Sequence, residues 1–348
     1  MSTAAKYAFA SDNTAGVCPE ALAALSAANR GRVPSYGDDA HTAEAKRLFA
    51  EVFERECDVF FVFNGTAANA LVLAALCQRH HAVLCHELSH VETDECGAPE
   101  FFTGGSKVLP IAGAQAKLHA ADLEPVMQRG HGVHFPKIRA LSLTQSTELG
   151  TVYTPDELRA LTAFARPRGL GVHVDGARFA NAAAAMSERR VAPADLTWRA
   201  GVDVLCFGGT KNGLLTTEAV VFFNRELARE FDYRVKQSGQ LASKMRFAAA
   251  QWAAVLRDGA WLRHGAQANR QARALAEGLT ALGFKLVAPV EANGVFVELP
   301  PALFAALEAR GWHFYKFVGE HGYRLMCSWE TQDADVAEFL ADARAARK

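Results

Sequence analysis

Neither sign of charge dominates this chain of 348 residues, because 37 Lys and Arg stand against 38 Asp and Glu, for a formal net charge of −1. Such a chain has no general attraction for phosphate backbones or anionic headgroups, which argues against a nucleic-acid partner and against a membrane surface. No apolar run approaches the roughly 18 residues of a membrane-spanning helix, and the N-terminal stretch has no apolar signal-peptide core. These absences favour a cytoplasmic protein.

Cysteine is sparse and shows no pairing pattern. The chain has seven Cys and no C-x-x-C motif, which favours a reduced intracellular protein whose cysteines are small buried hydrophobes. One stretch does gather possible zinc ligands, but its spacings suit only pairs on a helix face, so we expect no metal site. That stretch contains His81, Cys85, His86, His90 and Cys96.

The apolar pattern predicts an α/β fold. Half of the residues are apolar, which allows a large core, and the length suggests about two domains. Short β-branched stretches alternate with longer Ala- and Leu-rich ones, which is typical of a mostly parallel sheet with helices on both faces. We expect strands at 59–63, 81–85, 140–144, 170–175, 202–207 and 219–223, and helices at 42–55, 67–78, 155–165 and 177–186.

The pattern changes after about residue 235. There we expect helices at 241–256, 261–282, 301–309 and 334–346, and strands at 284–287, 294–298 and 323–327. This order of helices and strands is typical of a smaller α+β unit. We therefore predict an N-terminal arm (1–15), a large α/β domain (16–254) and a small C-terminal α+β domain (255–348).

Two strand ends carry candidate chemistry. Asp175 ends an apolar strand in the run His-Val-Asp-Gly-Ala-Arg (173–178), where ligands of open α/β sheets bind, although an Asp there could instead cap the next helix. Lys211 follows the next strand in Gly-Gly-Thr-Lys-Asn-Gly (208–213). In an apolar cleft its amine would become nucleophilic, and the alternative is a lysine on a surface loop.

A third segment resembles a phosphate cradle. A strand runs through Asn64 into Gly65, Thr66 and Ala67 and then into a helix, so three backbone N–H groups would point at one spot. The pattern is weak by itself. Together with the strand-end Asp and Lys it supplies a phosphate anchor, an acid for a pyridine nitrogen and a Schiff-base amine, which are the parts that pyridoxal phosphate needs.

With these motifs the sequence resembles the low-specificity L-threonine aldolase family, which are fold-type I pyridoxal-phosphate enzymes of the β-eliminating lyase superfamily. The resemblance implies a large domain with a mostly parallel seven-stranded sheet, a small α+β C-terminal domain, and a homotetramer of two dimers with active sites at the subunit interface. It spans nearly the whole chain and is carried by Ser-Asp-Asn-Thr (11–14), Tyr-Gly-Asp-Asp (36–39), Asn-Gly-Thr-Ala-Ala-Asn (64–69), Ser-His-Val-Glu (89–92), the run 173–178, Gly-Thr-Lys (209–211) and Arg-Leu (324–325).

The resemblance implies roles at the cofactor. Lys211 forms the Schiff base, Asp175 pairs with the pyridinium nitrogen, and Gly65 and Thr66 hold the phosphate. His90 stacks on the ring and acts as, or positions, the catalytic base.

It also implies roles at the substrate and across an interface. Arg178 borders the cofactor and, with Arg324 and the help of Ser11, binds the substrate carboxylate through a charge-assisted fork. Lys236 stands where relatives often have an Arg that reaches the phosphate of a neighbouring subunit. Tyr36 would contribute across the same interface.

One departure leaves the proton acceptor open, because Thr147 stands where many relatives carry a His that contacts the substrate hydroxyl. Asp94 is one replacement, since a helix would place it on the same face as His90. His134, which precedes the same central strand, is a second. An ordered water is the third.

The activity implied by the resemblance is cleavage of L-threonine and L-allo-threonine to glycine and acetaldehyde with low epimer specificity. A β-phenylserine aldolase would share every motif. A different pyridoxal-phosphate reaction, such as β-elimination or transamination, would use the same cofactor groups. A non-catalytic regulator that binds the cofactor is a further hypothesis, from another functional class.

Overall fold

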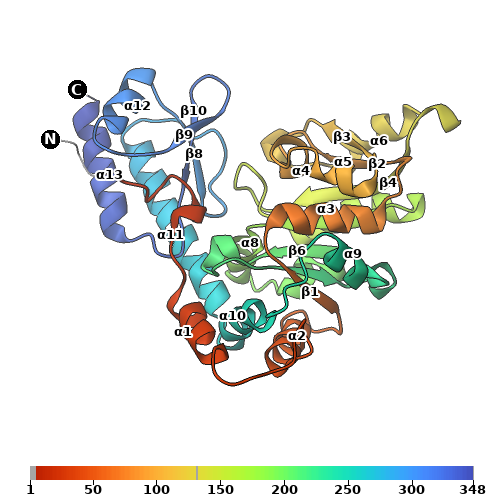
Figure 1. Cartoon of the computed structure of the whole chain (residues 1–348). Coiled ribbons are helices and arrows are strands. Elements are labelled where there is room, and N and C mark those ends of the chain that lie inside the picture. The colour runs from red at the N-terminus through yellow and green to blue at the C-terminus, as the bar shows by residue number, and fades with distance from the viewer. Residues whose placement is uncertain (1–4, 131, 348) are drawn as a thin grey trace.

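A computed structural model describes residues 5–130 and 132–347. It contains a seven-stranded sheet with helices on both faces, and a smaller unit with a three-stranded sheet (Figure 1). The predicted α/β class is confirmed. The first four residues of the predicted N-terminal arm and the last residue of the predicted small domain lie outside the described residues. Within 5–130 and 132–347, every helix is too short or too polar to span a lipid bilayer.

The large sheet is mostly parallel, in the order β1-β7-β6-β5-β4-β2-β3. Only β7 runs antiparallel to its neighbours, β1 and β6. One edge of the sheet therefore collects the carboxyl ends of the parallel strands together with the amino end of β7. The strands are β1 (Asp58–Val62), β2 (His81–His86), β3 (Lys107–Ile111), β4 (Lys137–Thr144), β5 (Gly171–Gly176), β6 (Val204–Gly208) and β7 (Glu218–Phe222).

Both faces of this sheet are buried. Val204 and Cys206 of β6 pack into the cluster under α3 (Gly65–Leu76), whereas Leu205 and Phe207 pack into the larger cluster on the opposite face. This explains why the strands read as continuous apolar runs. The other helices of this part are α1 (Pro19–Ala28), α2 (Ala40–Val52), α4 (His90–Thr93), α5 (Ala98–Thr103), α6 (Ala120–Gln128), α7 (Pro155–Ala165), α8 (Phe179–Ser187), α9 (Phe231–Gln237) and α10 (Arg246–Arg257).

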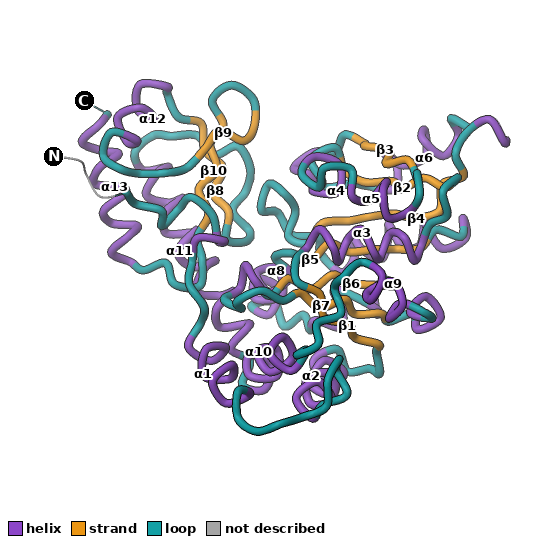
Figure 2. The backbone as a smooth tube through the Cα atoms, in the orientation of Figure 1, coloured by secondary structure: helices purple, strands orange, loops and turns teal. Residues whose placement is uncertain are grey.

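The smaller unit holds an antiparallel sheet in the order β8-β10-β9 and its own core. The N-terminal segment packs here, since Phe9 is fully buried against Trp312 and Phe339 and Lys6 pairs with Asp342 of the last helix (Figure 2). The elements are α11 (Ala260–Ala281), β8 (Gly294–Glu298), α12 (Pro301–Glu308), β9 (Tyr315–Val318), β10 (Gly322–Met326) and α13 (Asp333–Ala346). Helix α11 contributes to both cores, so the domain boundary near 255 stays a prediction.

Local chemistry explains which elements were predicted well. Helix α7 matches its predicted range because Thr154 and Glu157 form a capping box around a first-turn Pro155. The helix expected from 241 begins only at Arg246, after a turn. The strand expected at 284–287 is wrong, because a single bridge from Leu286 to β8 is followed by a bend. Strands β3 and β9 were not predicted.

Candidate active site

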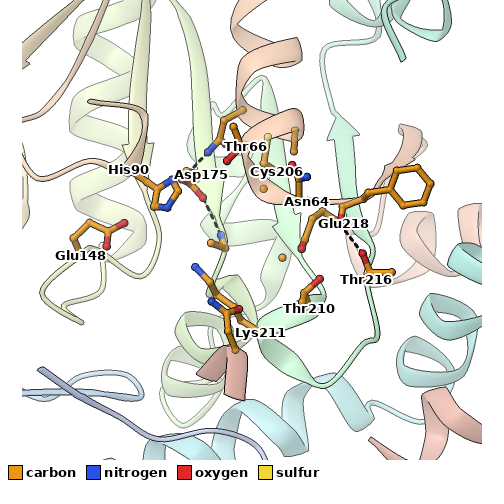
Figure 3. Close-up of a pocket in the computed structure, with 17 residues that line it drawn as sticks. Asn64, Thr66, His90, Glu148, Asp175, Cys206, Thr210, Lys211, Thr216 and Glu218 are labelled. Atoms are coloured by element: carbon orange, nitrogen blue, oxygen red, sulfur yellow. Dashed lines mark hydrogen bonds between the residues drawn. The ribbon is translucent and has the colours of Figure 1, made fainter. Parts of the chain in front are cut away.

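A cavity of about 310 Å³ opens at the edge of the sheet where the strand ends meet. Its lining comes from the segments after β1, β2 and β4, from the ends of β5 and β6 and the turns after them, from the start of β7, and from the N-terminal segment through Asn13. Figure 3 shows these side chains around the cavity. Five predicted residues line it together: Gly65, Thr66, His90, Asp175 and Lys211.

Asp175 is buried near the end of β5 on the face covered by α3. Its Oδ2 accepts a hydrogen bond from Asn69 Nδ2 of α3 at 2.9 Å, and its Oδ1 accepts one from the backbone N–H of Ala177 at 3.0 Å. The local turn bond expected of a capping residue is thus present, yet the carboxylate also borders the cavity. Two donors fix its orientation there.

Lys211 lies in a short 3-10 turn, Thr210–Asn212, that follows β6. A Cβ on Gly208 would lie 2.3 Å from the carbonyl oxygen of Ala177, so glycine lets the turns after β5 and β6 touch. This contact brings Lys211 to the same cavity as Asp175. The alternative of a lysine on a surface loop is wrong, because Lys211 is half-buried in the cavity wall.

The start of α3 forms only part of the predicted phosphate cradle. Gly65 and Thr66 line the cavity, and no atom lies within 4 Å of the position that a Gly65 Cβ would take. The backbone N–H of Ala67 donates to Asn64 Oδ1 at 2.8 Å, and Ala67 does not line the cavity, so its role at the phosphate stays a prediction. Gly65 and Thr66 still present the positive end of the helix dipole to an anion.

His90 belongs to a buried polar network that sequence analysis missed. Its Nδ1 lies 2.9 Å from Glu95 Oε1, and Asn69 Nδ2 donates to the same oxygen at 2.8 Å. Because Asn69 also donates to Asp175, one amide connects the two carboxylates. The hydrogen bond to Glu95 raises the pKa of His90, against the opposing effect of burial. The nearby charge of Glu148 adds to the increase.

The two side chains proposed as proton acceptors from the sequence lie outside the cavity lining. Asp94 is the exposed C-cap residue of α4, one turn after His90, whose carbonyl oxygen accepts its backbone N–H at 2.9 Å, and its charge acts on Arg324. His134 is exposed before the amino end of β4, and the eight residues of that strand span roughly 26 Å to the edge that holds the cavity. The prediction for His134 is therefore wrong.

The two arginines occupy different environments. Arg178 is buried in a bidentate ion pair, with Nε 2.7 Å and Nη2 3.0 Å from the carboxylate of Asp12, a partner that the sequence did not suggest. Arg324 of β10 hydrogen-bonds the hydroxyl of Tyr315, and its buried Nε has no partner among the described residues. Burial and then the charge of Arg178 lower the pKa of Arg324, so an anion placed between the two would be stabilised.

The remaining predicted residues lie outside this lining. Ser11 accepts a hydrogen bond from the backbone N–H of Asn13 at 3.2 Å and so caps a 3-10 turn, and Asn13 borders the cavity instead. Lys236 Nζ lies 4.9 Å from the centre of the Tyr36 ring, which is half exposed. These two residues thus form a surface pair.

Glu218 is a further cavity residue that sequence analysis missed. It begins β7, and the antiparallel register pairs it with Gly208, which brings it to the lysine turn. Its Oε2 accepts the backbone N–H of Gly209 at 2.6 Å, and burial raises its pKa to about 7. The apolar pattern does not show which strand runs antiparallel, so no sequence signal indicated that Glu218 would reach the cavity.

The stretch considered for zinc has other partners. His86 uses both ring nitrogens, one 2.9 Å from the carbonyl oxygen of Gly113 and the other accepting the backbone N–H of Leu88 at 3.0 Å. His81 Nδ1 accepts the backbone N–H of Gln78 at 3.0 Å, and His90 contacts Glu95. The histidines of this stretch therefore serve local structure and the polar network.

Comparison with known proteins places this geometry in context. The family model described as β-eliminating lyase matches residues 8–301. A low specificity L-threonine aldolase of Pseudomonas aeruginosa is 56% identical over 97% of this chain and 96% of its own length. One of a Pseudomonas species is 54% identical over 97% of both chains. A solved threonine aldolase of Leishmania major superposes with a TM-score of 0.92 at 29% identity, covering 98% of this chain and 99% of that one.

Proposed function

This chain belongs to the β-eliminating lyase family, and we propose that it cleaves L-threonine and L-allo-threonine to glycine and acetaldehyde. Enzymes of this kind depend on pyridoxal phosphate. The observation that carries the proposal is the single cavity shared by Lys211, Asp175 and the start of α3 at Gly65 and Thr66. The alternative of a non-catalytic regulator is disfavoured by the aldolases matched over nearly the whole chain.

The residues present fit the cofactor. A primary amine, a buried carboxylate held by two donors, and a helix start with open space before it are the groups that an aldehyde, a pyridine nitrogen and a phosphate require. When bound, pyridoxal phosphate supplies an electron sink for the pair released when the Cα–Cβ bond breaks. We assign Lys211 to the aldehyde, Asp175 to the ring nitrogen, and Gly65 and Thr66 to the phosphate.

The chain's own residues orient the substrate. Arg324, with Arg178 beside it, offers a desolvated guanidinium to the substrate carboxylate. His90, held through Nδ1 by Glu95, presents its ring to the cavity. Fixing the carboxylate sets the direction of the Cα–Cβ bond, which raises the rate through orientation.

We also propose a cytoplasmic homotetramer built as a dimer of dimers, with Tyr36 and Lys236 acting across the subunit interface. The support is a set of exposed large apolar side chains, since Tyr36 and Leu215 are about half exposed, at 50% and 51%, and Phe63, which lines the cavity, is 39% exposed. All seven cysteines are free, which fits a reducing compartment. A monomeric mass in sedimentation would contradict the assembly.

The reaction is tested directly by its products. The cofactor-loaded protein should release acetaldehyde and glycine from L-threonine in equal amounts, and the same from L-allo-threonine. A much faster reaction with β-phenylserine, giving glycine and the aromatic aldehyde, would favour the β-phenylserine aldolase. Consumption of threonine without glycine would overturn the proposal in favour of β-elimination or transamination.

Replacing Arg324 with glutamine should raise KM for L-threonine by about 10- to 100-fold. The reason is the loss of a hydrogen-bonded charge partner for the carboxylate, worth about 1.5–3 kcal/mol. Lys316, exposed on the neighbouring strand β9, provides the matched control, and Lys316→Gln should leave KM unchanged. Steady-state kinetics of both variants decide the point. Equal KM values would assign carboxylate binding to another group.

A further inference from the structure

The turn that follows β4 presents one carboxylate to the cavity. Glu148 lines the cavity and lies on its His90 side, as Figure 3 shows. Its neighbour Thr147 is buried and faces into the turn, where its Oγ1 lies 2.7 Å from Thr151 Oγ1 and accepts the Thr151 backbone N–H at 3.2 Å. The hydroxyl of Thr147 is therefore occupied, and the acidic residue beside it meets the substrate space.

This turn is firmly held. The backbone N–H of Gly150 donates to the Thr147 carbonyl oxygen at 2.9 Å, and Thr151 Oγ1 donates to the carbonyl oxygen of Gln115 at 2.8 Å. The next backbone N–H, of Val152, donates to a carboxylate oxygen of Glu291 at 2.6 Å. A group that exchanges a proton with a substrate needs this kind of fixed support.

Among the carboxylates of the cavity, Glu148 is the one left available. Asp175 accepts bonds from Asn69 and Ala177, and Glu218 accepts the backbone N–H of Gly209. Within the described residues, Glu148 has neither a hydrogen bond nor an ion pair, and it is only half-buried. Its lone pairs can therefore accept a proton or a hydroxyl without breaking an existing contact.

The surrounding charges favour a carboxylate in this role. The charge of Glu148 acts on His90, Arg178 and Arg324, so it lies close to the groups that we assign to the cofactor ring and to the substrate carboxylate. The hydrogen bond with Glu95 raises the pKa of His90 and occupies its Nδ1. Both oxygens of Glu148 are without a partner among the described residues, so Glu148 is the better placed acceptor.

We propose that Glu148 is the catalytic residue that accepts the β-hydroxyl proton of the substrate. The O–H electron pair becomes the second bond of the aldehyde carbonyl, the Cα–Cβ bond breaks, and its pair stays with the glycine fragment, whose Cα then gains a proton. Glu148 returns its own proton to solvent, so the atoms balance. In the reverse direction it donates that proton to the new alcohol. The inference rests on the proposed function.

The test separates cleavage from binding. Glu148→Gln keeps the size of the side chain and removes the base, so aldehyde release should fall by about 10²-fold or more. Glycine has no β-hydroxyl, so its dissociation constant, measured by titration of the cofactor absorbance, should stay at the wild-type value. Exchange of the glycine α-proton should also persist. Glu87→Gln is the matched control, because Glu87 is exposed just after β2, and it should behave as wild type.

A second variant guards against a misfolded protein. Glu148→Ala should regain part of its cleavage rate when formate is added, because a small carboxylate can occupy the vacated space. Near-wild-type cleavage by Glu148→Gln, or a parallel loss of glycine binding, would overturn the proposal. A loss confined to Asp94→Asn would also overturn it, in favour of Asp94. Aldehyde release by the wild-type protein is measured before any variant. If the wild-type protein releases none, the proposed function itself fails.

Discussion

Lys211→Ala should lower aldehyde release from L-threonine by about 10³-fold or more, which is the scale of loss when a covalent catalytic group is removed. Lys211 is the amine that lines the cavity at the exit of β6, and we assign the cofactor aldehyde to it. Removing it should also abolish the visible absorbance band of the lysine-bound cofactor. The Lys211→Ala variant should therefore lose both the absorbance band and the aldehyde release.

Lys285→Ala is the matched control, since Lys285 is exposed in the small unit and pairs with Glu298 at 2.8 Å. This variant should keep both the band and the activity. Added methylamine should restore some turnover to Lys211→Ala, because it supplies a primary amine in place of the missing one. A band that survives the Lys211 substitution would show that another lysine holds the cofactor.

The fold and the cofactor part of the site could be predicted because they depend on local patterns. A buried parallel strand has a continuous apolar sequence, and a polar residue near its carboxyl end indicates where the strand ends. Asp175 and Lys211 are two examples. The helix start at Gly65 has a similar local signature. Each of these residues lines the cavity as predicted, and their assigned roles stay predictions.

The rest depends on contacts between distant segments. Asp12 meets Arg178 across 166 positions of sequence, and Asn69 reaches Asp175 across 106, so no short motif records either pair. The end of a helix also matters. Asp94 is the C-cap residue of α4, and the carboxylate that contacts the His90 ring is that of its neighbour Glu95.

Strand direction and turn geometry determine where His134 and Glu148 lie. His134 precedes the correct strand but lies at its wrong end. Glu148 follows that strand and faces the cavity because the Thr147–Thr151 turn directs the neighbouring Thr inward. The sequence shows that Thr147 stands where many relatives carry a His, whereas the proposal for Glu148 needs the conformation of the turn.

Asp12→Ala should lower the free energy of unfolding by about 3–5 kcal/mol, because it leaves the buried guanidinium of Arg178 without its counter-charge. Both partners are almost fully buried, and Asn293 Nδ2 adds a 3.1 Å bond to Asp12. The pair joins the N-terminal segment to the start of α8, so its loss should also disturb the cavity wall at Asn13. Urea denaturation of the cofactor-loaded protein measures the change.

The exposed pair of Lys285 and Glu298 supplies the control, since Glu298→Gln should cost less than about 1 kcal/mol. Equal losses for the two variants would contradict a stabilising role for the buried pair.

The pH dependence of stability provides a second test of this pair. Burial alone would raise the pKa of Asp12, but the charges of Arg178 and Lys211 outweigh it and hold the pKa below its usual range. Because the folded value is depressed, this contribution is complete above the unfolded pKa, near 4, and is lost as the pH falls through the folded value. Wild-type stability should therefore decline below about pH 4 more steeply than that of Asp12→Asn, in which this proton-binding group is gone.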